Sequence, residues 1–271
     1  MYIPGKVFVV TGGGNGIGRA VVLDLVARGA KGVAAVDVDR DGLAETAALA
    51  GSAAVSTHVV DLADRDAVAA LPQAVVDTHG QVDGVLNVAG IIQRFVPVAE
   101  LSYEDIATVM DVNFWGVVHM TKEFLPLLME RPSASIVNVA SMGGLAPVPG
   151  QSVYGASKAA VKLFTEGLYA ELRDTPVDVT IIFPGAIATN ITANSGVDMG
   201  RTADSAESST MKMTSAADAA AQIIAAMEEG DYRATVGSDA RMIDRLSRLM
   251  PRRTTELVAK KMAALREPAK V

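Results

Sequence analysis

The chain has 271 residues, of which 50% are hydrophobic and 20% charged, and its net charge is −7. It contains no cysteine, which excludes disulfides and thiolate chemistry. Residues 1–240 hold 15 basic and 28 acidic side chains, which argues against nucleic acid as a partner. The opening MYIPGK lacks the features of a signal peptide, and the uncharged runs contain proline, glycine and polar residues. We therefore expect a cytoplasmic protein without a membrane span.

Apolar runs of strand length alternate with segments of helix length along the chain. This alternation predicts an α/β fold, a doubly wound parallel sheet (Rossmann fold) of about seven strands with helices on both faces. Most runs are apolar throughout, as is typical of strands buried on both faces. No linker interrupts the series, so we expect a single domain over 1–271. The expected strands are 7–10, 32–36, 54–60, 82–87, 135–140, 177–183 and 234–236, and the expected helices are 17–28, 42–50, 64–78, 102–129, 154–173 and 216–228.

The first expected strand is followed by TGGGNGIG, which has five glycines in eight residues. The dinucleotide fingerprint G-x-G-x-x-G does not fit, because Ile17 stands where its third glycine would fall. The spacing G-x-x-x-G-x-G, through Gly12, Gly16 and Gly18, does fit. Such a loop before a helix lets a diphosphate approach the bare backbone, and the helix dipole favours its charge. The alternative is a glycine-rich turn that binds no ligand.

Asp37 closes the second expected strand, nineteen residues after Gly18. An acid at this place in a Rossmann fold binds the adenosine ribose. Its carboxylate would accept hydrogen bonds from the ribose hydroxyls and would repel a 2′-phosphate. Val38 and Asp39 supply no cation, and the neighbouring acids oppose Arg40. The sequence therefore favours NAD over NADP.

Tyr154 and Lys158 lie four residues apart in YGASK, on one face of an expected helix. A nearby ammonium favours the phenolate, so we expect a lowered tyrosine pKa and proton exchange with an alcohol or carbonyl near neutral pH. The alternative is a core tyrosine beside a solvated lysine. Ser141 follows the strand 135–140, which places its hydroxyl at the carboxyl edge of the sheet, where ligands bind.

In the order of its motifs the chain resembles the short-chain dehydrogenases/reductases, in the subset with a TGxxxGxG loop and a YxxxK active site. The resemblance covers nearly the whole chain. One departure is Val88, where the family more often has a second Asn, and we expect little consequence from it. The motifs are TGGGNGIG, Asp61 in VVDL, NVAG at 87–90, Asn113 in DVNFWG, Ser141, YGASK, and PGAIAT at 184–189.

The resemblance implies a catalytic set of four residues. Tyr154 would be the acid/base, and Lys158 would bind the nicotinamide ribose and lower the tyrosine pKa. Ser141 would hydrogen-bond the substrate oxygen. Asn113 would shape the bend of its helix and hold a water in a proton relay.

The resemblance also implies an NAD site. Asp61 would contact the adenine, Asn87 would lie beside the cofactor, and Ile187 and Thr189 would fix the carboxamide. No metal is expected, because His58, His79 and His119 have no acidic or His partner at ligand spacing. The full expected cofactor set is Gly12, Gly14, Asn15, Gly16, Ile17, Gly18, Asp37, Asp61, Leu62, Asn87, Ala89, Gly90, Tyr154, Lys158, Pro184, Gly185, Ile187 and Thr189.

The expected activity is oxidoreduction of a secondary alcohol or ketone with NAD. The segment 143–151 and a substrate-binding loop at 190–214, with Met199, Met211 and Met213, should border the substrate, and their largely apolar or neutral composition suggests a hydrophobic molecule. Two alternatives remain: a dinucleotide-binding regulatory or structural subunit without turnover, and an NADPH-dependent 3-oxoacyl reductase. Asp37 and the neutral Asn15 disfavour the second.

Two further features concern assembly. The helices 102–129 and 154–173 have broad apolar faces, and in the family such helices form subunit interfaces, so a homodimer or homotetramer is expected. Phe114 and Trp115 are expected to pack rather than to contact substrate. The extension 240–271 is basic and amphipathic, and we expect it to pack on the protein itself near the pocket or subunit contact rather than on a membrane. Its two apolar stripes are Met242, Ile243, Leu246, Leu249 and Met250, then Leu257, Val258, Met262 and Leu265.

Overall fold

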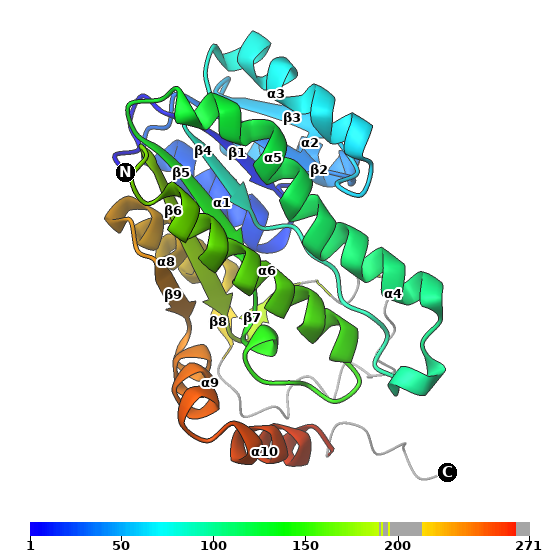
Figure 1. Ribbon diagram of the computed structural model, residues 1–271. Coiled ribbons are helices and arrows are strands. Elements are labelled where there is room, and N and C mark those ends of the chain that lie inside the picture. The colour runs from blue at the N-terminus through cyan, green and yellow to red at the C-terminus, as the bar shows by residue number, and fades with distance from the viewer. Residues whose placement is uncertain (190, 192–194, 196–212, 264–271) are drawn as a thin grey trace.

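A seven-stranded, fully parallel sheet runs through the protein in the order β3-β2-β1-β4-β5-β6-β9 (Figure 1). The structure is a computed structural model and describes residues 1–189, 191, 195 and 213–263. The strand order reverses between β1 and β4, and ligands bind at such switch points of open α/β sheets. The strands are β1 (Val7–Thr11), β2 (Gly32–Asp37), β3 (Val55–Val59), β4 (Gly84–Asn87), β5 (Ala134–Val139), β6 (Val177–Pro184) and β9 (Arg233–Val236).

Helices cover both faces of this sheet and bury two apolar layers (Figure 1). On one face lie α1 (Gly16–Ala27), α2 (Arg40–Ala50) and α8 (Ala216–Glu229). On the other face lie α3 (Arg65–His79), α5 (Gly116–Met129) and α6 (Ser152–Leu172). The doubly wound sheet predicted from the alternating runs is therefore confirmed.

The strand interiors follow the predicted burial except at the edges. β1, β4 and β5 are buried at every position, because helices cover both of their faces. The edge strands β3 and β9 are half-buried, since each has only one neighbour in the sheet. A shorter pair, β7 (Ile187–Ala188) and β8 (Thr214–Ser215), was not expected from the sequence and flanks the segment 189–213.

The segment predicted as one helix over 102–129 is interrupted by a π-helical turn. It consists of α4 (Tyr103–Met110), the turn η2 (Asp111–Trp115) and α5. Ser102 begins the helix by accepting a hydrogen bond from Asp105 N at 3.0 Å. The π turn contains the fully buried Asn113, and such turns often mark functional sites.

The apolar helix faces that suggested subunit contacts are partly used inside this chain. Part of the faces on α4, α5 and α6 packs into the core, whereas Tyr103, Met129 and Leu163 on the same helices are exposed. Trp115, expected to pack, is 48% exposed and stacks on His119. The buried members of those faces are Val109, Val117, Met120, Val161, Leu168 and Leu172.

The C-terminal extension folds as α9 (Ser238–Leu249) and α10 (Pro251–Ala263), with Pro251 at the start of the second helix. α9 packs beside β9 and the short 3-10 helix η3 (Met142–Gly144). Its buried residues are Ala240 and Asp244, whereas Met242, Leu249 and Met250 of the expected apolar stripe are exposed. α9 thus packs on the protein, with Ile243 and Leu246 of the expected stripe partly buried.

Other expectations lie partly outside the described residues. Almost the whole substrate-binding loop 190–214 does so, with Met199 and Met211, and Leu265 does as well. A further 3-10 helix, η1 (Val98–Glu100), precedes α4. None of the helices in the described part of the chain is long and apolar enough to cross a membrane.

Candidate active site

The glycine loop between β1 and α1 has a conformation that side chains would obstruct. Gly12 and Gly16 have φ values of +71° and +52°, in the left-handed region that favours glycine. A Cβ on Gly18 would collide with the carbonyl oxygen of Gly12, so the helix can approach the strand only with glycine there. The N-terminus of α1 therefore opens directly onto the loop, as a diphosphate site requires.

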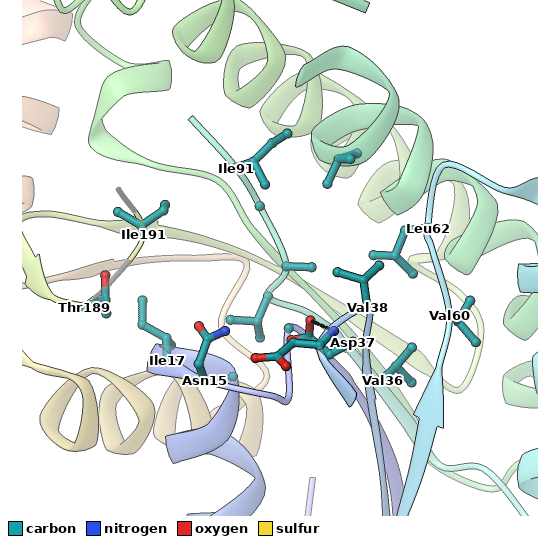
Figure 2. Close-up of a pocket in the computed structure, with 18 of the residues that line it drawn as sticks. Asn15, Ile17, Val36, Asp37, Val38, Val60, Leu62, Ile91, Thr189 and Ile191 are labelled. Carbon is teal, nitrogen blue, oxygen red and sulfur yellow. Dashed lines mark hydrogen bonds between the residues drawn. The ribbon is translucent and has the colours of Figure 1, made fainter. Parts of the chain in front are cut away.

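A cavity of about 400 Å³ lies against this loop, at the carboxyl ends of β1, β2 and β4. Figure 2 shows Ile17, Thr189 and Ile191 on one side of it and Val36, Val60 and Leu62 on the other. Its charged lining consists of Asp37, Asp39 and Asp61, and no Lys, Arg or His is among the described lining residues. The cavity can hold an elongated ligand with apolar rings and hydroxyl groups, and it disfavours additional phosphate near Asp37.

Asp37 holds the glycine loop in addition to lining the cavity. One carboxylate oxygen accepts a hydrogen bond from Gly14 N at 2.9 Å, and the other accepts one from Asp39 N at 3.1 Å. A Cβ on Gly14 would lie only 3.0 Å from the Asp37 carboxylate. Thr11 makes the matching contact to the segment after β4, because its hydroxyl accepts hydrogen bonds from Val88 N and Ala89 N at 3.0 and 3.1 Å. The loops at the switch point are thus fixed by side chains of β1 and β2.

Gly90 connects the cavity to the buried polar groups of α6 and the π turn. It lines the cavity, and a Cβ on it would lie 2.9 Å from Lys158 Nζ and 3.2 Å from Asn113 Oδ1. Lys158 Nζ donates a hydrogen bond to Val139 O at 3.0 Å. Burial lowers the pKa of Lys158 to about 8. Its ammonium is therefore charged at pH 7 and lies beside the end of the cavity.

Ser141 and Tyr154 form the other half of this cluster. Ser141 follows β5, and its hydroxyl accepts a hydrogen bond from Gly143 N at 3.0 Å. A Cβ on Gly143 would lie 3.3 Å from the Tyr154 ring and 3.4 Å from Ser141 Oγ. Burial raises the pKa of Tyr154, and a hydrogen bond with the Ser141 side chain opposes that rise.

The expectation of a lowered Tyr154 pKa is therefore wrong for this structure. Removal of the phenolate from water outweighs the hydrogen bond from Ser141. Lys158 directs its ammonium to a backbone carbonyl and is not among the groups that shift the tyrosine pKa. At neutral pH the Tyr154 side chain is a phenol, which is a proton donor.

The turn after β6 completes the surroundings of the cavity. Ala186 N donates a hydrogen bond to Asp239 of α9 at 2.7 Å, and that carboxylate occupies the space where Gly185 lacks a side chain. Thr189 reaches the glycine loop, since its Cγ2 lies 3.4 Å from the position of a Cβ on Gly16. Neither Pro184 nor Ile187 is among the cavity residues.

Most of the expected cofactor residues lie together around the cavity. Gly14 holds Asp37 without lining it, and Asn87 is buried, with its Nδ2 donating to Asn138 Oδ1 at 2.8 Å and its Oδ1 without a partner. Tyr154 and Lys158 do not line the cavity, and Lys158 Nζ lies beside Gly90, which does. The expected residues that line the cavity are Gly12, Asn15, Gly16, Ile17, Gly18, Asp37, Asp61, Leu62, Ala89, Gly90 and Thr189.

Several lining residues were not anticipated from the sequence. They are mainly aliphatic side chains at or just after strand ends, where the strand pattern itself could have identified them. Val88, the departure from the family motif, is one of them. The set is Val36, Val38, Asp39, Val60, Val88, Ile91, Val112 and Ile191.

His58 and His79 share a serine as a hydrogen-bond partner. The Ser56 hydroxyl is hydrogen-bonded to His58 Nε2 at 2.9 Å and to His79 Nε2 at 2.8 Å. α3 carries His79 back to the edge strand β3, a proximity that the linear spacing does not reveal. Among the described residues no group of three potential metal ligands is found, and the pair lies outside the cavity.

Comparison with known proteins agrees with this geometry. A model of the short chain dehydrogenase family matches residues 6–200. SadH of Mycobacterium tuberculosis, whose name describes an oxidoreductase, is 42% identical over 263 residues that cover 94% of each chain. A short chain dehydrogenase/reductase from Burkholderia phymatum, in complex with NAD, superposes with a TM-score of 0.82 and 28% identity over the full length of both chains. A short chain dehydrogenase from Burkholderia cenocepacia, in complex with NADP, gives a TM-score of 0.78 and 26% identity over 99% of this chain and all of its own.

Proposed function

The chain belongs to the short-chain dehydrogenase/reductase family and is an oxidoreductase, and from that premise we propose that it transfers a hydride between NAD and a secondary alcohol or ketone, with Tyr154 as acid/base. The observation that carries the proposal is one juxtaposition. Gly90 lines a glycine-cradled cavity with acidic residues, and the space of its missing side chain lies next to the Lys158 ammonium and the Asn113 amide. The bound nicotinamide would supply or accept the hydride.

The preference for NAD rests on the charge of the cavity. Related structures contain NAD in one case and NADP in another, so family membership leaves the choice open. In this chain the end of β2 presents Asp37 and Asp39 to the cavity, and the described lining contains no cation to neutralise a 2′-phosphate. Each Asp37 oxygen accepts one backbone hydrogen bond and keeps lone-pair capacity for ribose hydroxyls.

The proton-transfer role of Tyr154 rests on its protonation state and its neighbours. Because burial raises its pKa, the side chain holds a proton at neutral pH that it can donate to the oxygen of a ketone being reduced. Ser141, hydrogen-bonded to Tyr154, would hold the same substrate oxygen. Alcohol oxidation needs the deprotonated tyrosine, so its rate should rise with pH.

Three supporting roles complete the proposal. Lys158 would bind the ribose hydroxyls through its buried ammonium, while Asn113, fixed in the π turn, would orient groups between Gly90 and Ser157. The substrate would be hydrophobic, because Ile91 and the turn around η3 offer mainly apolar or neutral groups near Ser141. We further propose that residues 190–214 contribute to substrate binding and that the enzyme is cytoplasmic and forms a homodimer or homotetramer.

The proposal is tested by replacing Tyr154 with Phe after a panel of secondary alcohols has been screened for NADH formation at alkaline pH. We expect the wild type to reduce NAD with at least one apolar alcohol. Tyr154→Phe should lower kcat by about 100-fold or more, because general acid–base catalysis contributes that much. NADH binding, followed by fluorescence, should change less than about threefold, since the phenol oxygen is only one of many contacts. Turnover by the variant within a few fold of wild type would contradict the assignment.

A non-catalytic dinucleotide-binding role makes the opposite prediction for the wild type. Such a protein would bind NADH yet convert no alcohol or ketone in the panel. Reduction restricted to 3-oxoacyl thioesters with NADPH would instead support the reductase alternative. The two cofactors are therefore compared with every substrate of the panel.

A further inference from the structure

The first turn of α6 contains a backbone donor that its own N-cap residue does not satisfy. α6 starts at Ser152, and its N-cap residue Gln151 makes no side-chain cap hydrogen bond. The first N–H groups of a helix have no partner within the helix and need one from elsewhere. For Tyr154 that partner comes from far along the chain: its backbone N donates to the Oε1 of Gln93, at 2.9 Å and 61 residues away in sequence.

Gln93 is held in place by hydrogen bonds at its side-chain amide and at its backbone carbonyl. Its Nε2 donates to Gly150 O at 3.1 Å, and its backbone carbonyl accepts a hydrogen bond from Gln151 Nε2 at 2.6 Å. Both glutamines are only 3% exposed. One amide orientation alone satisfies these contacts, because Gly150 O requires a donor and Tyr154 N–H requires an acceptor.

The backbone carbonyl of Tyr154 is linked to residue Ile91, two positions before Gln93, through the π turn. Ser157 Oγ donates to Tyr154 O at 2.8 Å and accepts from Asn113 Nδ2 at 3.0 Å. Asn113 is in turn bonded to both backbone groups of Ile91, at 2.8 and 2.9 Å. Ile91 and Gln93 therefore hold Tyr154 from its N–H and, through two intermediates, from its carbonyl.

This segment also reaches the region proposed to bind substrate. Ile92 N donates to Ser195 Oγ at 3.0 Å. Residues 91–93 thus hold the π turn, the start of α6 and Ser195, three parts of the chain that are distant in sequence. Gln93 is the member that does so through a buried side chain, and nothing in its sequence context marks it.

We propose that Gln93 is a positioning residue for Tyr154: its amide supplies the missing cap of α6 and sets where the phenol lies relative to Ser141 and Lys158. The inference rests on the proposed role of Tyr154 as acid/base. A displacement of the helix start moves the phenol with it, and errors of about 1 Å in the position of a reacting group can reduce rates by about 100-fold. Gln93 itself touches no reacting atom.

The test compares Gln93→Met with Gln151→Met. Both replacements remove a buried glutamine amide from the same hydrogen-bonded cluster, but only the first removes the acceptor of Tyr154 N–H. We expect Gln93→Met to lower kcat by about tenfold or more, with NADH affinity within about twofold of wild type, because the effect acts on geometry at the reacting centre. Gln151→Met loses the hydrogen bond to Gln93 O but leaves the Gln93 side chain bonded to Gly150 O and Tyr154 N, so its kcat should stay within about threefold of wild type.

Hydrogen exchange of the Tyr154 amide provides a readout that needs no turnover. In Gln93→Met this amide should exchange about tenfold faster than in wild type, as expected from the loss of a hydrogen bond of ordinary strength. In Gln151→Met it should remain protected. Melting temperatures should fall by similar amounts in the two variants, so a general loss of packing would not separate them.

Equal losses of kcat in the two variants, or unchanged exchange in Gln93→Met, would overturn the proposal. A failure of the underlying function is distinguishable from these results. It would be seen as an active Tyr154→Phe enzyme, whereas the exchange experiment reports on the Gln93 cap whether or not Tyr154 transfers a proton.

Discussion

At the residue scale, Lys158 is a buried charge whose proposed role is to bind the ribose hydroxyls of the cofactor. Its side chain is 3% exposed and has one backbone acceptor, Val139 O. Burial of the ammonium lowers the lysine pKa to about 8, and no acidic partner compensates for it in the proposed site. A charged group in this setting is retained for its interaction with a ligand rather than for stability.

We therefore predict that Lys158→Met is more stable than wild type at pH 7 and inactive. Between pH 8 and 10.5 the unfolded chain binds a proton that the folded chain does not, so stability falls as pH falls from about 10.5 to about 8, and the full cost of burying the ammonium is present below pH 8. The shift corresponds to about 3 kcal/mol at most, reduced by the hydrogen bond to Val139 O that methionine cannot make. Thermal unfolding at pH 7 and at pH 10 measures the difference. A lower Tm of the variant at pH 7, or a gain that grows with pH, would contradict the prediction.

Asp37 combines two functions at the residue scale, since it holds Gly14 N and faces the cavity. Replacement by Ala should weaken NAD binding and relieve the exclusion of NADP, because one change removes a hydroxyl acceptor and a repelling charge. We expect the ratio of kcat/KM for NAD over NADP to fall by about tenfold or more. Asp61→Ala is the matched control, because it removes another carboxylate from the cavity, in the segment that follows β3. A wild-type enzyme that uses NADP as well as NAD would show that Asp37 does not exclude the 2′-phosphate.

At the element scale, α9 ties the C-terminal extension to the proposed site. Asp239 in its first turn holds Ala186 N, and Asp244 pairs with Arg233 and Arg248. Arg233 also lies 4.3 Å above the Phe183 ring, at the end of β6 that leads into the turn 184–189. The extension therefore supports one wall of the site, although Met242, Leu249 and Met250 of its apolar stripe are exposed.

Deletion of residues 241–271 should accordingly alter substrate binding or assembly more than NADH binding. It removes Asp244 and leaves Arg233, buried beside Glu166, without its closest carboxylate. We expect a severalfold higher substrate KM or a changed oligomeric size in gel filtration, with NADH affinity kept within about twofold. Unchanged KM and size, together with sedimentation of the intact protein on anionic vesicles, would favour a membrane role instead.

The elements that could be predicted from sequence are those with local patterns. The buried strands, the glycine loop and the Tyr154–Lys158 pair follow from apolar runs, backbone conformation and helical spacing. The π turn at 111–115, the β7–β8 pair and the role of Gln93 could not be predicted, because each depends on hydrogen bonds between distant segments. The direction of the Tyr154 pKa was missed for a related reason: burial and a neighbouring charge act oppositely, and only the folded geometry shows which is larger.

At the scale of the whole molecule, residues 1–240 are acidic and the C-terminal residues 241–271 are basic. Residues 241–271 carry nine basic and three acidic side chains, against 15 basic and 28 acidic in residues 1–240. The parallel sheet brings the ends of β1, β2, β4, β5 and β6 to one edge, and the acidic cavity, the Ser141–Tyr154 pair and α9 meet there. The proposed hydride transfer requires all of these parts at once.

The most direct test is to follow the hydride itself. A secondary alcohol identified in the screen is prepared with deuterium on its carbinol carbon, and the NADH formed by the enzyme is analysed by mass spectrometry. If the carbinol hydride passes to NAD with Tyr154 as acid/base, each NADH molecule contains one deuterium and Tyr154→Phe forms almost no NADH. Unlabelled NADH, or labelled NADH formed equally fast by Tyr154→Phe, would contradict it.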